Sequence, residues 1–411
     1  VNNGTTTLTG SVKLTRSKEA GASASDNGGN SWYTIANYGT MEINTGVTVK
    51  NAGGYSSMIR NGGDVTADCN LTIKGGNFTG GINTVKNDLF GVLTINGGNF
   101  SNTAQYVIMN WNKAEITAGT FQTLDTASAV LFTSAYGGDA NTVGKLTISG
   151  GEFKHASDTQ EMIVDHYDAS NSGTAAVTGG KFDADISKYI PTDYVQSADG
   201  TVEKLGETNA VAKVGGTYYK TLADAVAAAQ DGDTITLLKD AELTSTLNLA
   251  KNITIDGQGK YTIKAANSFT VGSDNKTYCV LYVSGEVTLK DVTVNGNEKC
   301  RVIFCDKGKL TIDGATITNG KAPNFIGGVY MTSSASFEMK SGSITGNKNA
   351  KGYQNDEYLQ YSSDLWIGAN ANGALTAING GTIGTRQCVV GQQSWQLHDE
   401  RWYGHQSLCG A

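Results

Sequence analysis

The chain has 411 residues, including 53 Gly, 2 Pro and 6 Cys, and a formal net charge of −7 at neutral pH. This length can bury a core in two domains or in one elongated repeat structure, and the glycines lack the three-residue period of collagen. The acidic balance excludes the basic surface that nucleic acid attracts, and no apolar run reaches the roughly 18 residues of a membrane-spanning helix. We therefore expect no nucleic-acid partner and no membrane insertion. Without a CxxC pair, we expect no metal or other cofactor.

An eight-residue motif recurs through the first half of the chain. Its copies read LTIKGGNF, LTINGGNF, AEITAGTF, LTISGGEF and AAVTGGKF, and they start at Leu71, Leu93, Ala114, Leu146 and Ala175. In each copy two apolar residues flank a polar one, which is the period-2 pattern of a half-buried strand. The glycines predict a turn, and the phenylalanine after them should return to the core. Starts 22, 21, 32 and 29 residues apart are typical of the coils of a solenoid.

A second strand can be aligned upstream of each first-half motif. It reads MIRN from Met58, VIMN from Val107, LFTS from Leu131 and IVDH from Ile163. The alignment predicts one column of Arg60, Met109, Thr133 and Asp165, and a second column of Asn61, Asn110, Ser134 and His166. Asp165, His166 and Asp168 form a dense titratable group, which suits general acid and base chemistry. A hydrogen-bonding ladder on the surface is the alternative.

A boundary between two coil stacks is expected near residue 205. Residues 190–207 read as a connector, and Leu222, Ala225, Val226 and Ala229 then follow helical spacing. We expect a short capping helix at about 221–230, covering the end of a new stack. The predicted domains are residues 1–205, residues 206–385 with this cap, and a non-repeat tail at 386–411. The tail is either a C-terminal cap or an artificial or out-of-frame extension.

The second half carries its own repeats and two predicted side-chain columns. One column alternates in charge, and it contains Asp256, Lys290, Asp313, Lys340 and Asn379. Asp256 and Asp313 would be roughly 9.6 Å apart, two rungs of a stack, but the lysine between them favours structural ion pairs over catalysis. The other column is aromatic and flanked by apolar residues, and it contains Tyr282, Phe304, Tyr330 and Trp366. It is either an exposed strip for sugar rings or a strip covered by loops.

The longest second-half coil holds carboxylates among tyrosines. Glu357 and Asp364 lie in the segment KGYQNDEYLQYSSDLW, which is longer than a coil requires. Such a loop fits a cleft that binds or cleaves sugars. A solvated loop is the alternative.

The cap KTLADAVAAAQDGDTITLL and the repeated LTIxGG resemble the pectate-lyase-like superfamily of right-handed parallel β-helices. In particular they resemble the Gly- and Thr-rich repeats of surface proteins in gut Firmicutes. The resemblance implies a monomeric, extracellular or cell-surface piece of a larger secreted bacterial protein, with an oligo- or polysaccharide partner. The superfamily includes lyases, glycoside hydrolases, esterases and non-catalytic adhesins. A lyase fits less well, because the acids near Arg301 do not match that family's calcium-binding pattern.

Two functional hypotheses follow. The first is a glycoside hydrolase in which one carboxylate is the acid and another is the base or nucleophile, either Asp165 with Asp168 or Asp364 with Glu357. The second is a non-catalytic adhesin or carbohydrate-binding module. In both, His166, Arg60 and the aromatic column of Tyr282, Phe304, Tyr330 and Trp366 would contact the glycan.

Overall fold

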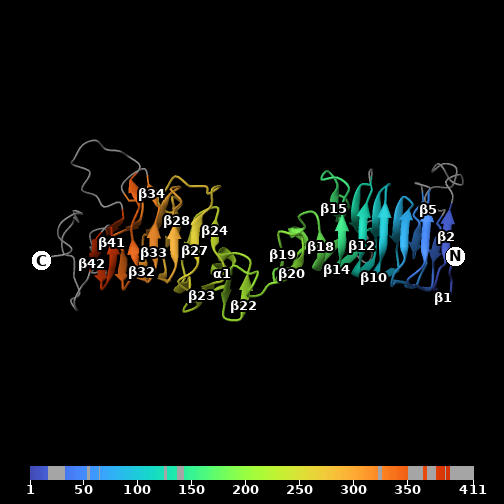
Figure 1. Ribbon diagram of the computed structural model, residues 1–411, viewed down its shortest axis with the longest axis horizontal. Coiled ribbons are helices and arrows are strands. Elements are labelled where there is room, and N and C mark those ends of the chain that lie inside the picture. The colour runs from blue at the N-terminus through green and yellow to red at the C-terminus, as the bar shows by residue number, and fades with distance from the viewer. Residues whose placement is uncertain are drawn as a thin grey trace. The chain divides into compact units, whose positions relative to one another are not determined.

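The computed structural model describes residues 1–16, 33–52, 56–63, 65–124, 127–136, 143–322, 326–349, 364–367, 376–384 and 386–388. The chain divides into two compact units, Val1–Lys204 and Leu205–Ala411. In each unit, strands from successive coils pair in parallel and build long sheets (Figure 1). The predicted fold class is therefore confirmed: the protein is all-β, and its stacked coils form a parallel β-helix.

Two long parallel sheets wrap the core of the first unit. The larger follows the repeated motif and contains β1 (Thr5–Leu8), β4 (Thr40–Ile43), β7 (Cys69–Ile73), β10 (Gly91–Asn102), β12 (Lys113–Thr123), β14 (Lys145–Lys154) and β18 (Thr174–Phe182), with β2 (Lys13–Arg16), β5 (Thr48–Asn51) and β8 (Asn77–Gly80) beside them. The other contains β3 (Ile35–Asn37), β6 (Ile59–Asn61), β9 (Asn83–Asn87), β11 (Tyr106–Asn110), β13 (Ala129–Thr133) and β15 (Glu161–Val164). Two antiparallel hairpins and a 3-10 turn follow: β16 (His166–Asp168) with β17 (Asn171–Ser172), η2 (Ser187–Tyr189), and β19 (Tyr194–Gln196) with β20 (Val202–Lys204).

The phenylalanines of the motif form a continuous stack inside the first unit. Neighbouring rings lie 4.5 to 4.9 Å apart and are parallel within 10°, in the order Phe78, Phe100, Phe121, Phe153 and Phe182. Each ring also packs against the glycine two residues before it. At Gly119, for example, φ is +126° and a Cβ atom would lie 3.1 Å from the Phe121 ring. This glycine thus provides both the turn and the space for the ring.

Buried asparagines form a second ladder at the end of the other sheet. Each side-chain amide donates to the oxygen of the next, at 2.7 to 2.9 Å, in the order Asn2, Asn37, Asn61, Asn87 and Asn110. Asn110 Nδ2 continues the ladder to Thr133 Oγ1 at 3.1 Å. The same amides donate to turn carbonyls, such as those of Gly91 and Lys113 from Asn87. The ladder therefore satisfies buried backbone groups where the chain leaves the sheet.

Three parallel sheets make up the second unit. The first contains β22 (Thr217–Tyr219), β21 (Ala212–Val214), β23 (Thr234–Leu237), β26 (Ile253–Asp256), β29 (Glu286–Lys290), β32 (Gly308–Asp313), β36 (Ala335–Met339) and β40 (Thr376–Ile378); β21 pairs antiparallel with its neighbours. The second contains β24 (Ala241–Leu243), β27 (Thr262–Ala265), β30 (Thr293–Asn295), β33 (Thr316–Thr318), β37 (Ser343–Ile344), β41 (Gly381–Ile383) and the antiparallel β42 (Arg386–Cys388). The third contains β25 (Leu247–Leu249), β28 (Cys279–Val283), β31 (Arg301–Cys305), β35 (Val329–Met331) and β39 (Leu365–Ile367), and β34 (Lys321–Ala322) pairs separately with β38 (Lys348–Asn349).

The predicted capping helix is present as α1 (Leu222–Ala228). Its N-cap is Thr221, whose hydroxyl accepts a hydrogen bond from the Asp224 amide at 3.0 Å. Leu222, Ala225 and Val226 are buried in the core of the second unit. At the other end of the helix, Lys251 Nζ donates to the carbonyls of Val226, Ala227 and Ala229. No helix of the described residues is long and apolar enough to span a membrane.

Candidate functional site

An exposed aromatic cluster lies on the first unit, built from three successive coils. Trp111 follows β11 directly, Tyr136 follows β13 by three residues, and Tyr167 lies in β16. The Trp111 ring centroid is 5.4 Å from that of Tyr136, at 88°, and 5.8 Å from that of Tyr167, at 58°. Tyr136 and Tyr167 are 51% and 68% exposed, whereas Trp111 is 5% exposed. We call these three residues the Trp111 platform.

The platform rests on the core of the coil stack. Trp111 contacts the buried Phe132 ring edge-on, at 4.9 Å between centroids, and Tyr106 contacts the same ring at 4.8 Å. The indole Nε1 of Trp111 is buried and has no hydrogen-bond partner among the described residues. A buried indole N–H normally has an acceptor, and leaving it unpaired costs roughly 1–3 kcal/mol.

The β16/β17 hairpin fixes the position of Tyr167. The Tyr167 amide donates to Ser134 Oγ at 2.9 Å, and the Ser134 hydroxyl donates to the Asn171 carbonyl at 2.8 Å. Asp168 closes the hairpin by accepting from the amides of Ser170 and Asn171 at 2.8 and 3.0 Å, and from Asn171 Nδ2 at 2.9 Å. Tyr167 is therefore an exposed ring on an anchored backbone.

The carboxylates beside Tyr167 are both held in ionised form. Asp165 Oδ2 lies 2.7 Å from Lys188 Nζ, and Asp165 Oδ1 lies 3.1 Å from Nδ1 of the exposed His166. Burial acts to raise the pKa of Asp165, but the bonds to Lys188 and His166 outweigh it and leave the pKa below its ordinary value. The backbone hydrogen bond from Ser170, helped by Asn171, lowers the pKa of Asp168. Neither carboxyl group holds a proton near neutral pH, as a general acid must. Their role as an acid and base pair remains a prediction.

The predicted columns of the first unit need a correction of register. Met109 pairs with Phe132 and not Thr133, Phe132 pairs with Val164, and Asn110 pairs with Thr133. The expected alignment of β13 is therefore wrong by one residue. The ladder changes at β13 from an asparagine amide to the Thr133 hydroxyl, whereas the sequence alignment placed Ser134 in the column of Asn110. In a strand, a one-residue slip moves every side chain to the opposite face.

Arg60 is consequently in a different column from Asp165. It pairs with Ala36 and Lys86 on neighbouring coils. Its Nε donates to Asp88 Oδ2 at 2.9 Å, and its guanidinium lies 5.3 Å from the Tyr33 ring centroid. Arg60 therefore forms a partly buried ion pair in another part of the first unit.

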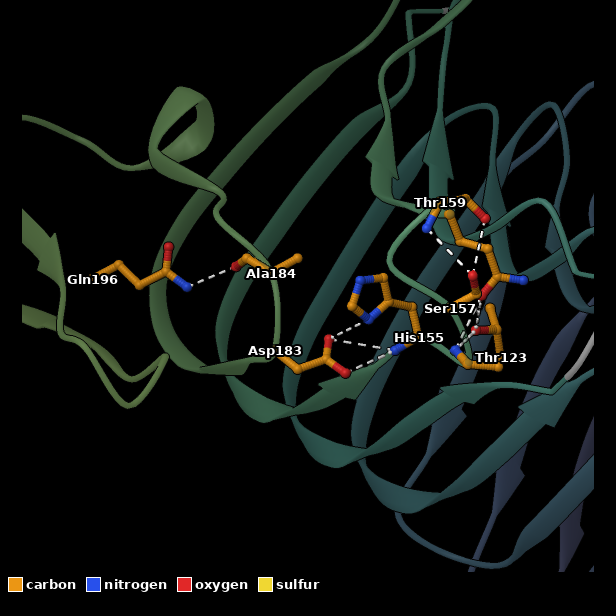
Figure 2. A network of polar contacts seen from close by, with 9 residues as sticks. Thr123, His155, Ser157, Thr159, Asp183, Ala184 and Gln196 are labelled. Atoms are coloured by element: carbon orange, nitrogen blue, oxygen red, sulfur yellow. Dashed lines mark hydrogen bonds and ion pairs between the residues drawn. The ribbon is translucent and has the colours of Figure 1, made fainter.

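A polar network connects the last coils of the first unit (Figure 2). His155 Nδ1 lies 2.9 Å from Asp183 Oδ1, and the His155 amide donates to the same carboxylate. Ser157 Oγ lies 2.9 Å from Thr159 Oγ1, and no hydrogen bond joins Ser157 to His155 among the described residues. The network therefore links adjacent coils but does not assemble a Ser-His-Asp triad.

The predicted aromatic column of the second unit is confirmed. Tyr282 pairs with Phe304, Phe304 with Tyr330, and Tyr330 with Trp366 on successive coils. The residues flanking the first three rings are fully buried, so these rings lie on the outer face. However, Tyr282 and Phe304 stack on each other at 6.0 Å, and Phe304 and Tyr330 contact at 5.4 Å. Neighbouring rings of the column pack against one another, and Phe304 in its middle is only 4% exposed. The column is therefore not an open platform for sugar rings.

The second carboxylate pair can be placed only in part. Glu357 lies outside the described residues. Asp364 Oδ1 accepts hydrogen bonds from the Asn347 amide at 3.1 Å and from Asn347 Nδ2 at 2.8 Å. Burial raises the pKa of Asp364 above its ordinary value, and the bonds from Asn347 only partly oppose this. Of the expected carboxylates that are described, Asp364 is the one whose pKa shifts toward that of a general acid.

The predicted alternating charges form ion pairs. Lys290 Nζ lies 2.8 Å from Asp256 Oδ2, and Lys340 Nζ lies 3.7 Å from Asp313 Oδ2. These contacts support the structural interpretation of this column. Within the described ranges, no group of three His, Cys, Asp or Glu side chains could hold a metal ion.

Comparisons with protein-family models, with curated proteins and with solved structures find no match. The candidate sites therefore rest on the geometry of this chain alone. Sequence reasoning missed the Trp111 platform, although a signal was present. An aromatic residue follows the ladder position closely in several coils, as Trp111 follows Asn110 and Tyr136 follows Thr133.

Proposed function

We propose that the first unit is a carbohydrate-binding module that binds a neutral glycan at the Trp111 platform. The observation that carries this proposal is the pair of strongly exposed tyrosines that contact the buried Trp111 ring. Sugar rings present apolar C–H faces that pack on exposed aromatic side chains. The two tyrosine rings offer such faces.

The polar groups next to the platform fit the same role. Side chains alternate along a strand, so Asp168 points away from Tyr167 and is not part of this surface. Asp165, two residues before Tyr167, is ionised, and a carboxylate accepts hydrogen bonds from sugar hydroxyls without any proton transfer. The β-helix fold and the resemblance to the pectate-lyase-like superfamily also favour a glycan partner and an extracellular or cell-surface location.

Affinity electrophoresis through gels containing neutral polysaccharides tests the proposal, followed by calorimetry with oligosaccharides of any polymer that retards the protein. Tyr167→Ala should weaken binding roughly tenfold, because one aromatic contact contributes about 1–1.5 kcal/mol. Tyr136→Ala should weaken it by a similar factor. Phe90→Ala is the matched control, since Phe90 is 39% exposed on the same unit but does not belong to the platform. Failure of every neutral polysaccharide to retard the protein, or equal losses with Phe90→Ala, contradicts the proposal.

A second candidate function is glycoside hydrolysis centred on Asp364. The raised pKa of this half-buried carboxyl, directly before the strand that carries Trp366, favours it. The expected partner is Glu357, as nucleophile or base. Chromogenic glycosides should then be turned over by the wild type and not by Asp364→Asn or Glu357→Gln. Full activity in both variants, or no turnover of any substrate, removes this candidate.

A further inference from the structure

The aromatic column of the second unit carries a buried positive charge. Arg301 is 5% exposed, and its guanidinium carbon lies 4.8 Å from the Tyr330 ring centroid and 5.8 Å from that of Phe304. Its Nε donates to the Ile326 carbonyl at 2.9 Å, and its Nη1 donates to Asn275 Oδ1 at 3.1 Å. These contacts hold the planar group against the rings in one orientation.

No carboxylate balances this charge among the described residues. The thiols nearest Arg301, Cys279 and Cys300, have pKa values raised to about 12 by burial, so they are neutral. Asp306 is occupied elsewhere, because its Oδ2 accepts from Tyr282 Oη and lies 3.0 Å from Lys276 Nζ. A buried charge without a counter-ion is costly, and such charges are ordinarily paired.

One end of the guanidinium remains available to a ligand. Among the described residues Arg301 Nη2 has no hydrogen-bond partner, and it is not one of their fully buried polar atoms that lack one, so no described group holds this end of the guanidinium. Lys276 lies over the next ring of the column, 5.3 Å from the Tyr282 centroid, with its side chain 56% exposed. The outer face thus presents a fixed donor and, over the next ring, an exposed cation that also contacts Asp306.

We propose that Arg301, assisted by Lys276, is a binding site for an anionic group, a carboxylate or a sulfate, carried by an acidic glycan. A guanidinium donates paired N–H groups to such oxyanions with directional geometry, and a partly desolvated site strengthens the contact. The net charge of −7 disfavours non-specific attachment of polyanions, so a local site is required for binding. This site is on the second unit, whereas the neutral-glycan platform is on the first.

A matched series of polymers isolates the anionic group from the sugar backbone. The full chain is titrated with dextran, carboxymethyl-dextran and dextran sulfate, and the last two distinguish a carboxylate from a sulfate ligand. Either charged polymer should bind at least tenfold more tightly than neutral dextran. Arg301→Gln should remove most of this difference, and Lys276→Met should reduce it severalfold. Phe90→Ala, on the first unit and outside both proposed sites, should leave the difference unchanged.

The control for general charge effects is Lys290→Met. Lys290 is an exposed cation of the same unit, but it pairs with Asp256 and does not belong to the aromatic column. Circular dichroism checks folding of each variant, and if Arg301→Gln does not fold, the surface variant Lys276→Glu decides by charge reversal. The proposal is overturned if a folded Arg301→Gln or Lys276→Glu binds charged dextran like the wild type. Equal losses with Lys290→Met, or no preference for charged polymer, also overturn it.

Discussion

The buried asparagine ladder makes a quantitative prediction at Asn87, which lies in the middle of the first unit. Asn87 is fully buried, and its Nδ2 lies within 2.8 to 2.9 Å of three acceptors: Asn110 Oδ1 and the carbonyls of Gly91 and Lys113. Its Oδ1 accepts from Asn61 Nδ2 at 2.9 Å. Asn87→Ala removes all four contacts and leaves turn carbonyls without their donor.

The expected loss follows from these contacts. A net contribution of roughly 0.5–1.5 kcal/mol per hydrogen bond gives about 2–6 kcal/mol. Three acceptors share two N–H groups, so we expect roughly 3 kcal/mol in the free energy of unfolding. Asn99→Ala is the matched control, because Asn99 Nδ2 donates at 3.0 Å to Asn77 Oδ1 on the exposed face of the same unit. That substitution should cost about 0.5 kcal/mol or less.

Urea denaturation followed by far-ultraviolet circular dichroism measures both variants. The two units can unfold separately, so the transition of the first unit is identified as the one that Asn87→Ala shifts. A loss at Asn87 no larger than the loss at Asn99 would refute the assignment of a stabilising role to the ladder.

Three further predictions concern the core, the cap and pH. Phe121→Ala should lower the free energy of unfolding of the first unit by about 4 kcal/mol. This loss should be larger than that of Phe182→Ala, because Phe121 has a stacked ring on both sides and Phe182 has one on a single side. Equal losses in urea denaturation would contradict this. Lys251→Met should speed amide hydrogen exchange at the C-terminal end of α1, since Lys251 donates to three carbonyls there. Unchanged protection of these amides would show that Lys251 does not stabilise the end of the helix. The raised pKa of Asp364 means that its stabilising protonated form is fully present below the ordinary value of 3.8 and is lost as pH rises through the raised value. Asp364→Asn should therefore raise the melting temperature near pH 7 and leave it unchanged near pH 3, and the opposite order would show that the carboxylate is stabilising.

The sequence predicted those parts of the fold in which one coil repeats the chemistry of the next. The motif phenylalanines and the residues from Tyr282 to Trp366 align because stacked coils place like side chains over one another. The prediction slipped where the chemistry changes, from the amide of Asn110 to the hydroxyl of Thr133. A threonine hydroxyl and an asparagine amide can occupy the same place in the ladder, and a pattern of residue types does not reveal this equivalence.

The candidate sites were harder to predict for a different physical reason. Trp111, Tyr136 and Tyr167 follow their strands at different distances, so their contacts depend on how each turn folds. The absence of a counter-ion for Arg301 among the described residues also depends on three-dimensional packing, since Asp306 is close in sequence but is bonded to Lys276 and Tyr282. Column alignment identifies faces of a solenoid, but it does not show which side chains on a face are covered.

The most direct test of glycan binding at the Trp111 platform is ¹⁹F NMR of protein labelled with 5-fluorotryptophan. The chain has five tryptophans, and the Trp111 resonance is assigned by its loss in Trp111→Phe. Titration with a neutral oligosaccharide should shift the Trp111 resonance in proportion to occupancy, and Tyr167→Ala should move the midpoint of this shift to a roughly tenfold higher oligosaccharide concentration. A Trp111 resonance that stays in place while the oligosaccharide saturates the protein would contradict the account.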